Sequence, residues 1–325
     1  MDQQCNESCN SVGPSFNMIS NITTIAIGVT GIWMNILVLA VIIRERKMHT
    51  PCFLLIAVSS LGSLFLAVFY LTGSVMRIGE YYGLWSLSNR SKLFCLLSKA
   101  YILGMMAIAL NVQTVFMVAL DRLLCSVAPV RYRNRGRSYA TVGLSLCAVY
   151  AVAAMLIVLF DGPELSSHIA TCNNVGLALG SRALSLFAGV NLVFCVLSVI
   201  TYIAMFVCVC VKKIKMDTTT ANGGFSSAAE RQMFMRQAAI LPSAKILLVL
   251  YVITGIAPEL IYNVAIPGGI MFDLAGQLKT SSSLVEMISL AARCKLFREG
   301  LRKMFACTPN DLIKVVSTAQ SVRSP

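Results

Sequence analysis

The sequence predicts an all-α membrane protein, a bundle of seven transmembrane helices followed by a short amphipathic helix. The 325-residue chain is 57% hydrophobic, has a mean hydropathy of +0.76 and carries only 13% charged residues, whereas a soluble domain has about 25%. Its apolar residues gather in seven long segments. The formal net charge of +13 does not indicate a nucleic-acid partner, because the charges lie in the short loops between these segments.

Each apolar segment is long enough to cross about 30 Å of hydrocarbon as a helix. We expect the seven spans at 19–43, 51–76, 95–124, 139–160, 183–211, 241–266 and 269–292. The seventh is the weakest, because Asp273, Gln277, Lys279 and the serine run 281–283 fall within it. Six spans followed by a surface helix is therefore the alternative.

The placement of the positive charges favours seven spans. All but six of the 27 Lys and Arg residues lie in or beside loop 44–50, the loops after the third and fifth spans, and the C-terminal tail. Basic loops stay in the cytoplasm, so we expect an extracellular N-terminus and a cytoplasmic C-terminus, which requires an odd number of spans. Residues 1–15 lack the basic start and apolar core of a cleavable signal peptide, and the first span is expected to act as the insertion signal.

We divide the chain into an extracellular tail (1–18), a seven-helix domain (19–292), an interfacial helix (293–306) and a cytoplasmic tail (307–325). The longest loop, 212–240, contains Asn222-Gly223-Gly224 and is expected to be a flexible linker. Asn6 and Asn89 begin glycosylation sequons on the predicted outer side.

The most informative feature is Asp121-Arg122, at the inner end of the third span. A charged pair at a membrane boundary is costly unless the protein uses it. The acid can neutralise the base, and a basic loop follows. The alternative is a helix-end arginine that extends its charge to the interface without any further role.

Two cysteines are expected to form a disulfide bond. Cys95 begins the third span on the outside, and Cys172 lies in the outer loop between the fourth and fifth spans. Both face an oxidising compartment, and a bond between them would hold this loop over the bundle as a lid. Cys5 and Cys9 either pair with each other or stay free. The spacing of cysteines and histidines resembles no zinc site, and we expect neither metal nor cofactor.

The stretch from Leu110 through Asp121-Arg122-Leu123 to Pro129-Val130-Arg131-Tyr132 resembles the rhodopsin-like G-protein-coupled receptors. More narrowly, it resembles the nematode serpentine chemoreceptors of class Srsx. The resemblance extends over about residues 18–305, and its further matches are Asn35, Cys95 with Cys172-Asn173, Tyr202 and Pro258.

The resemblance implies a two-state switch. In such receptors the acidic neighbour holds the arginine in the resting state. When an agonist binds on the extracellular side, the cytoplasmic end of helix six moves away from the bundle. The arginine, here Arg122, then helps to engage a heterotrimeric G protein. Pro258 removes a backbone hydrogen bond and would supply a hinge in helix six, an ordinary kink being the alternative. The implied location is the plasma membrane, with sensory neurons as a candidate cell type.

The chain departs from the family pattern in three helices. A serine, in the run 57–61, stands where members commonly have an aspartate in helix two. Glu286-Met287 stands in place of the late Asn-Pro of helix seven, and Ile256-Ala257-Pro258 contains no tryptophan. Glu286 either supplies the acid missing from helix two or reflects relaxed constraint in a receptor that does not signal.

The expected pocket for an extracellular ligand, a small molecule or a peptide, lies between the outer halves of helices three, five, six and seven. Its polar candidates are Lys99, Tyr101, Asn191, Glu259, Asn263, Asp273, Gln277 and Lys279. Glu259 either pairs with Lys99 or Lys279 or recognises a cationic ligand. The outer half of helix three has no aspartate, which disfavours a biogenic amine.

Beyond the seventh span, residues 295–305 alternate apolar and basic side chains with helical spacing, as in an interfacial helix on the inner leaflet of the bilayer. Cys307 follows as a palmitoylation candidate, or as a free cysteine.

A channel or transporter is disfavoured because the two halves of the chain show no repeat. An enzyme is disfavoured because no intramembrane acids or nucleophiles have catalytic spacing. A divergent seven-helix protein that does not signal remains the main alternative to a receptor.

Overall fold

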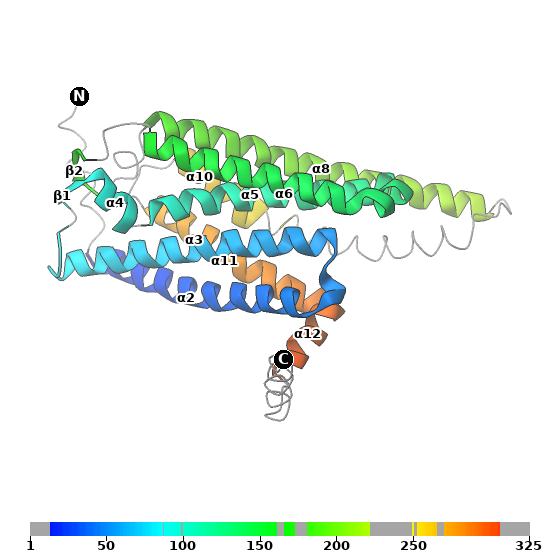
Figure 1. Ribbon diagram of the computed structural model, residues 1–325, viewed down its shortest axis with the longest axis horizontal. Coiled ribbons are helices and arrows are strands. Elements are labelled where there is room, and N and C mark those ends of the chain that lie inside the picture. The colour runs from blue at the N-terminus through cyan, green and yellow to red at the C-terminus, as the bar shows by residue number, and fades with distance from the viewer. Residues whose placement is uncertain are drawn as a thin grey trace, which may run out of the picture.

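In the computed structural model, long helices run side by side along one axis and form an elongated bundle (Figure 1). The structure describes residues 14–86, 88–98, 100–160, 166–172, 181–221, 249, 252–264 and 270–305. Their elements, in chain order, are α2 (Pro14–Arg44), the 3-10 helix η1 (Arg46–Met48), α3 (Pro51–Tyr81), β1 (Ser88–Ser91), α4 (Lys92–Ser98), α5 (Tyr101–Val127), α6 (Pro129–Phe160), β2 (His168–Thr171), α8 (Ser181–Ala221), the π-helix η2 (Val252–Ile256), α10 (Ala257–Val264), α11 (Ile270–Arg293) and α12 (Lys295–Phe305).

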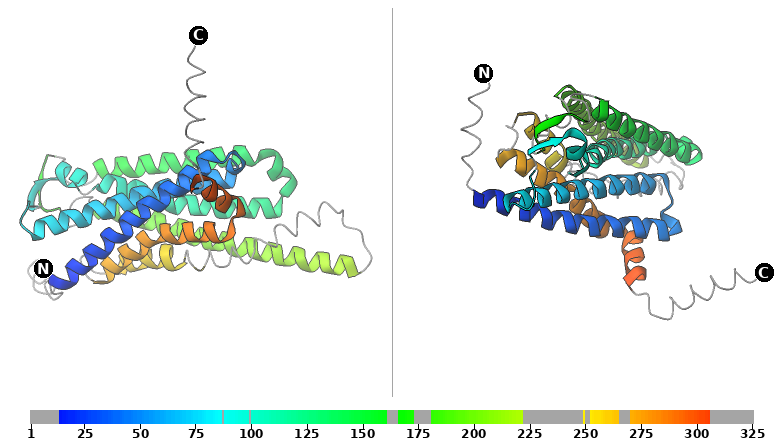
Figure 2. Two further views of the ribbon diagram at one scale, coloured as in Figure 1. Left: turned by 90° about the horizontal axis from the view of Figure 1, so that it is seen from below. Right: turned by 60° about the vertical axis from the view of Figure 1, so that its left-hand side comes forward.

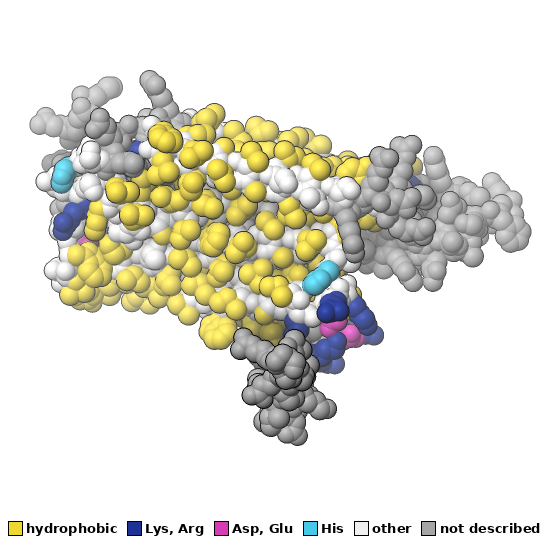
Figure 3. Space-filling model, viewed as in Figure 1, with side chains coloured by type: hydrophobic (Ala, Val, Ile, Leu, Met, Phe, Trp, Pro, Cys, Tyr) yellow, Lys and Arg dark blue, Asp and Glu magenta, His cyan; other side chains and the backbone are white. Residues whose placement is uncertain are grey.

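Five of the described helices are long and apolar enough to cross a membrane, at Met18–Arg44, Pro51–Tyr81, Tyr101–Val127, Ser138–Ile157 and Ser185–Lys212. They correspond to the first five predicted spans. Apolar side chains cover the length of the bundle in Figure 3, while charged ones gather near its ends. Val149 and Phe160 are 66% and 82% exposed, which suits a surface that faces lipid.

The bundle is organised around α5, which packs against α3, α6 and α8. We call the end with β1, β2 and α4 the disulfide end; it lies at the left of Figure 1. The opposite end, where η1 and α12 lie, is the basic end, and its exposed basic side chains include Arg46, Lys47, Arg298, Arg302 and Lys303. One buried cluster, including Met105, Ala109, Cys147 and Ala151, joins α5 to α6.

The prediction of one continuous helix over 95–124 is wrong at its start. The chain forms the short helix α4, and α5 begins only at Tyr101. Between them Ala100 adopts a left-handed conformation, with φ 51° and ψ 33°, which is unusual for a residue that carries a Cβ. Hydropathy could not reveal this break, because α4 is as apolar as the helix that follows.

The helices also reach further into the predicted loops than expected. α6 begins at Pro129, ten residues before the predicted span, because proline suits the first position of a helix. α8 continues to Ala221, so the start of the loop at 212–240 is helical and not a flexible linker. The residues from Lys212 to Met216 favour helix, and the helix ends directly before Asn222-Gly223.

Helix six shows irregular backbone near its proline. The π-helical segment η2 ends at Ile256, and Pro258 lies in the first turn of α10. Short π-helical segments widen a helix locally and often occur where it bends. The predicted kink at Pro258 therefore coincides with a local change of helix type.

α12 forms as predicted and is docked against the basic end, at an angle to the bundle (Figures 1 and 2). Phe297 is fully buried with Val38, Val41, Ile42 and Met48. A Cβ on Gly300 would lie 2.6 Å from Cγ1 of Val41, so glycine permits this close approach to α2. Beside these contacts, Nζ of Lys303 lies 2.6 Å from Oε2 of Glu45, the residue between α2 and η1.

Candidate functional site

The charged pair of the third span lies at the basic end of α5, the central helix. Asp121 is only 7% exposed. The hydroxyl of Tyr132 donates a 2.6 Å hydrogen bond to Oδ1 of Asp121. The break at Ala128 and the helix start at Pro129 bring Tyr132 back over the last turns of α5. The predicted residues Asp121 and Tyr132 are therefore in direct contact.

The two oxygens of the Asp121 carboxylate differ in their surroundings. Oδ2 is buried without a hydrogen-bond partner in the described part of the chain, so the contact with Tyr132 satisfies only one of them. Burial and the hydrogen bond to Asp121 raise the pKa of Tyr132. Its hydroxyl consequently keeps its proton and remains a donor at physiological pH.

Arg122 points to a different partner. Its Nη2 atom donates to Sγ of Cys52, the second residue of α3, at 2.7 Å. The expected arrangement, in which Asp121 holds Arg122, therefore differs from the observed one. Successive side chains on a helix point about 100° apart, since one turn takes 3.6 residues, and here the acid meets α6 while the base meets α3.

Further bonds tie the end of α5 to α8. Nζ of Lys212 donates to the backbone carbonyl oxygens of Ser126 and Val127, which have no partner within their own helix. Tyr202, another predicted switch residue, is buried with Ala119 and Met205. The basic end of α5 is thus linked to α3 through Cys52, to α6 through Tyr132 and to α8 through Lys212.

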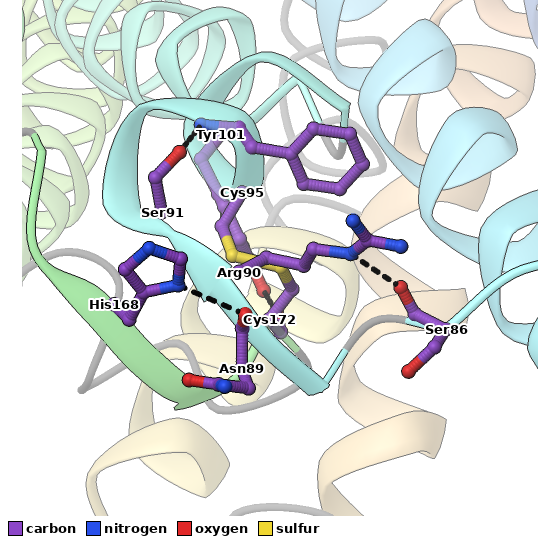
Figure 4. The surroundings of a disulfide bond; sticks show 9 residues. Ser86, Asn89, Arg90, Ser91, Cys95, Tyr101, His168 and Cys172 are labelled. Atoms are coloured by element: carbon purple, nitrogen blue, oxygen red, sulfur yellow. Dashed lines mark hydrogen bonds between the residues drawn. A yellow bond between two sulfur atoms is a disulfide. The ribbon is translucent and has the colours of Figure 1, made fainter.

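At the disulfide end, Cys95 of α4 is bonded to Cys172, as the topology predicts (Figure 4). The hydroxyl of Tyr101 donates a 2.8 Å hydrogen bond to the carbonyl oxygen of Cys172. Next to the disulfide, β1 pairs antiparallel with β2, and Nδ1 of His168 lies 3.0 Å from the backbone carbonyl oxygen of Asn89. The outer loop is therefore held by a covalent bond, a small sheet and Tyr101.

Besides Tyr101, three of the predicted pocket residues have described side chains within the bundle. Asn191 of α8 is 1% exposed, and neither Nδ2 nor Oδ1 has a hydrogen-bond partner in the described part of the chain. Lys279 of α11 is 5% exposed. Gln277 donates to the carbonyl oxygen and Oγ of Ser20, so it faces α2. Lys279 follows two residues later, which is a rotation of about 200° around the helix, so it lies on the opposite side of α11 from Gln277.

The other predicted site residues cannot be placed at the level of side chains. Asn6, Lys99 and Cys307 lie outside the described residues, as do the side chains of Pro129, Glu259, Asn263, Asp273 and Glu286. Asn89 is exposed in β1. Pro258 is buried in α10.

Sequence reasoning missed two residues of the basic end, Cys52 and Lys212. Lys212 was visible only as one of several loop charges, and Cys52 only as an apolar residue of the second span. It also missed a polar contact between the second and third spans, where Oγ of Ser63 donates to Oδ1 of Asn111 at 3.4 Å. A Cβ on Gly62 would lie 2.6 Å from the same oxygen, so glycine makes room for Asn111.

The geometry can be compared with known proteins. No match to a curated protein was found. A family match confirms the seven-helix fold. Residues 25–294, most of the chain, match the family model described as serpentine type 7TM GPCR chemoreceptor Srsx, and the chain therefore belongs to this family of multi-pass membrane receptors.

Proposed function

We propose that this receptor binds an extracellular chemical signal near its disulfide end and activates a heterotrimeric G protein at its basic end. The observation that carries the proposal is the position of Arg122. It lies at the basic end of the central helix, and the polar contacts around it join three neighbouring helices. Such contacts can be exchanged between two states of the bundle, as a switch requires.

The orientation follows from the charges. The basic end would face the cytoplasm, because basic segments beside membrane spans are retained there. The N-terminus would then be extracellular and the C-terminus cytoplasmic. The exposed basic residues of α12 would lie against the anionic inner leaflet, with Cys307 available for palmitoylation. The disulfide between Cys95 and Cys172 suits the oxidising outer side.

The ligand pocket would lie beneath the loop that the disulfide holds. Asn191 is its best supported member, because its amide is almost fully buried and has no hydrogen-bond partner in the described part of the chain, and buried polar groups require partners. Lys279, which is also almost fully buried, is a second member. Lys99, Glu259, Asn263 and Asp273 are further members. Tyr101 would act through the lid, because its hydroxyl bonds to Cys172. Gln277 is engaged with α2.

The signal would pass through helix six. Pro258 and the π-helical segment before it give this helix a weak point, about which its inner half would move. Glu286 of helix seven would take over the role of the acid that helix two lacks.

The test is a G-protein reporter assay in cells that express the full chain. The receptor is exposed to a pool of small volatile molecules, ascaroside-like lipids and peptides. We expect a response that disappears in Arg122→Ala, while staining of the receptor at the cell surface persists. A response that survives in Arg122→Ala would refute the proposed switch. A receptor that reaches the surface but activates no G protein in the panel would favour the alternative of a protein that does not signal.

A further inference from the structure

The resemblance led us to expect that Arg122 pairs with Asp121, but in the structure Arg122 contacts Cys52. Nη2 of Arg122 donates to Sγ of Cys52, while the described bond of Asp121 is to Tyr132. We propose that the Cys52 thiol of α3 is the latch that holds Arg122 in the inactive receptor. This inference rests on the proposed coupling to a G protein and names the residue that restrains it.

Cys52 is held firmly enough to serve as a latch. It is 6% exposed and occupies the first turn of α3, behind Thr50 and Pro51. The backbone before it is also fixed, because the amide of Leu54 donates to the carbonyl oxygen of Thr50 at 3.0 Å. Met48, just upstream, is fully buried in the cluster that anchors α12. The thiol therefore has a defined position relative to α5.

The geometry also explains why the acid does not perform this task. Oδ1 of Asp121 is engaged by Tyr132 from α6, and the adjacent Arg122 side chain is directed to α3. The two contacts restrain α5 from two sides. Release of Arg122 would break the bond to α3, and the contact between Asp121 and Tyr132 could persist.

A thiol acceptor suits a contact that must break on activation, because its hydrogen bond is weak. A thiol sulfur is a weak hydrogen-bond acceptor, whereas a carboxylate would hold a guanidinium with a stronger, charge-assisted and often bidentate pair. A latch of this strength would favour the inactive state only modestly. Breaking one hydrogen bond of ordinary net strength shifts a two-state equilibrium by about three- to ten-fold.

The first arm of the test measures signalling without ligand. Cys52→Val keeps the approximate size of the side chain but removes the acceptor, and Cys52→Ser keeps an acceptor. We expect basal reporter activity to rise about three- to ten-fold in Cys52→Val and to stay nearer the parent level in Cys52→Ser, at equal surface expression. Cys208→Val, on α8, is the matched control and should leave basal activity unchanged. Parent-level basal activity in Cys52→Val overturns the latch.

The second arm does not depend on signalling. The melting temperatures of the purified full-length receptor are compared for the parent, Cys52→Val, Arg122→Met and the double variant. If the two side chains interact, their effects are not additive, and the double variant should melt close to Arg122→Met alone. Additive shifts overturn the contact. If no G protein responds to the parent, the proposed function fails, and this cycle still decides whether Cys52 holds Arg122.

Discussion

The phenolic oxygen of Tyr132 lies 2.6 Å from Oδ1 of Asp121, and this bond joins the first turn of α6 to the end of α5. Oδ2 of the same carboxylate is buried without a hydrogen-bond partner in the described part of the chain. The acid of the pair at the end of α5 thus depends on one neighbouring hydroxyl, which lies in the segment that was expected to be a loop.

Removal of that hydroxyl should destabilise the receptor. In Tyr132→Phe the buried carboxylate would lose its described donor, and an unsatisfied buried group of this kind costs about 1–3 kcal/mol. We expect a lower melting temperature of the purified receptor. Tyr139→Phe is the matched control, because Tyr139 lies on the same helix and is 42% exposed. Equal melting temperatures for Tyr132→Phe and the parent would show that the bond contributes nothing.

The disulfide should be a major source of stability at the opposite end. It closes a long loop, since its cysteines are 77 residues apart, and loss of such a bond costs about 2–5 kcal/mol. The double variant Cys95→Ser with Cys172→Ser should therefore melt well below the parent. A reducing agent should lower the melting temperature of the parent by much more than that of the double variant. A parent insensitive to reduction would contradict this account.

The docking of α12 should depend on pH. The hydrogen bond and charge of Lys303 lower the pKa of Glu45. Since this pKa is lower in the docked state than in the undocked one, the stabilisation is complete above the ordinary glutamate pKa and fades as the pH falls through the lowered value. The protection of the α12 amides against hydrogen exchange, relative to the intrinsic exchange rate at the same pH, should therefore decrease when the pH is below the ordinary glutamate range.

The matched variant for this experiment is Glu45→Gln, which removes the ionisable group and keeps the shape. Its exchange at α12 should be faster at neutral pH and should lack the acid-dependent step. The difference should shrink in high salt, because the pair is near the surface. If Glu45→Gln retained the same pH dependence as the parent, another group would be responsible.

Hydropathy and the positions of the cysteines predicted different parts of this structure. Hydropathy reports burial in lipid, and it located the first five spans within a few residues, apart from the break at Ala100. It is insensitive to helix that continues into water, which is why the extension of α8 to Ala221 was missed. The disulfide followed from topology, because Cys95, at the outer start of the third span, and Cys172, in the outer loop between the fourth and fifth spans, lie on the same side of the membrane.

The contacts of Arg122 could not be predicted in this way. Its position at a helix end follows from hydropathy, but its partner depends on the tilt and rotation of α3 relative to α5. A cysteine in an apolar segment reads as a packing residue, and nothing in its neighbours marks Cys52 as an acceptor. Tertiary packing, and not spacing along the chain, determines this contact.

Asn191 provides a test that separates stability from function. A buried amide without a partner destabilises the fold, by about 1–3 kcal/mol on the basis of mutational data. Asn191→Leu, which replaces the amide by an apolar side chain of similar size, should therefore raise the melting temperature by a few degrees. If the amide is reserved for the ligand, the same substitution should abolish the reporter response, as is common where function requires unsatisfied groups.

The control for Asn191→Leu is Ser198→Ala, on the same helix. The Ser198 hydroxyl already donates to the carbonyl oxygen of Phe194 at 2.8 Å, so its removal should change neither ligand response nor melting temperature substantially. A lower melting temperature in Asn191→Leu would mean that the amide has a stabilising partner, such as a bound water molecule. A higher melting temperature with an intact response would place Asn191 outside the ligand site, because the ligand would then bind without its amide.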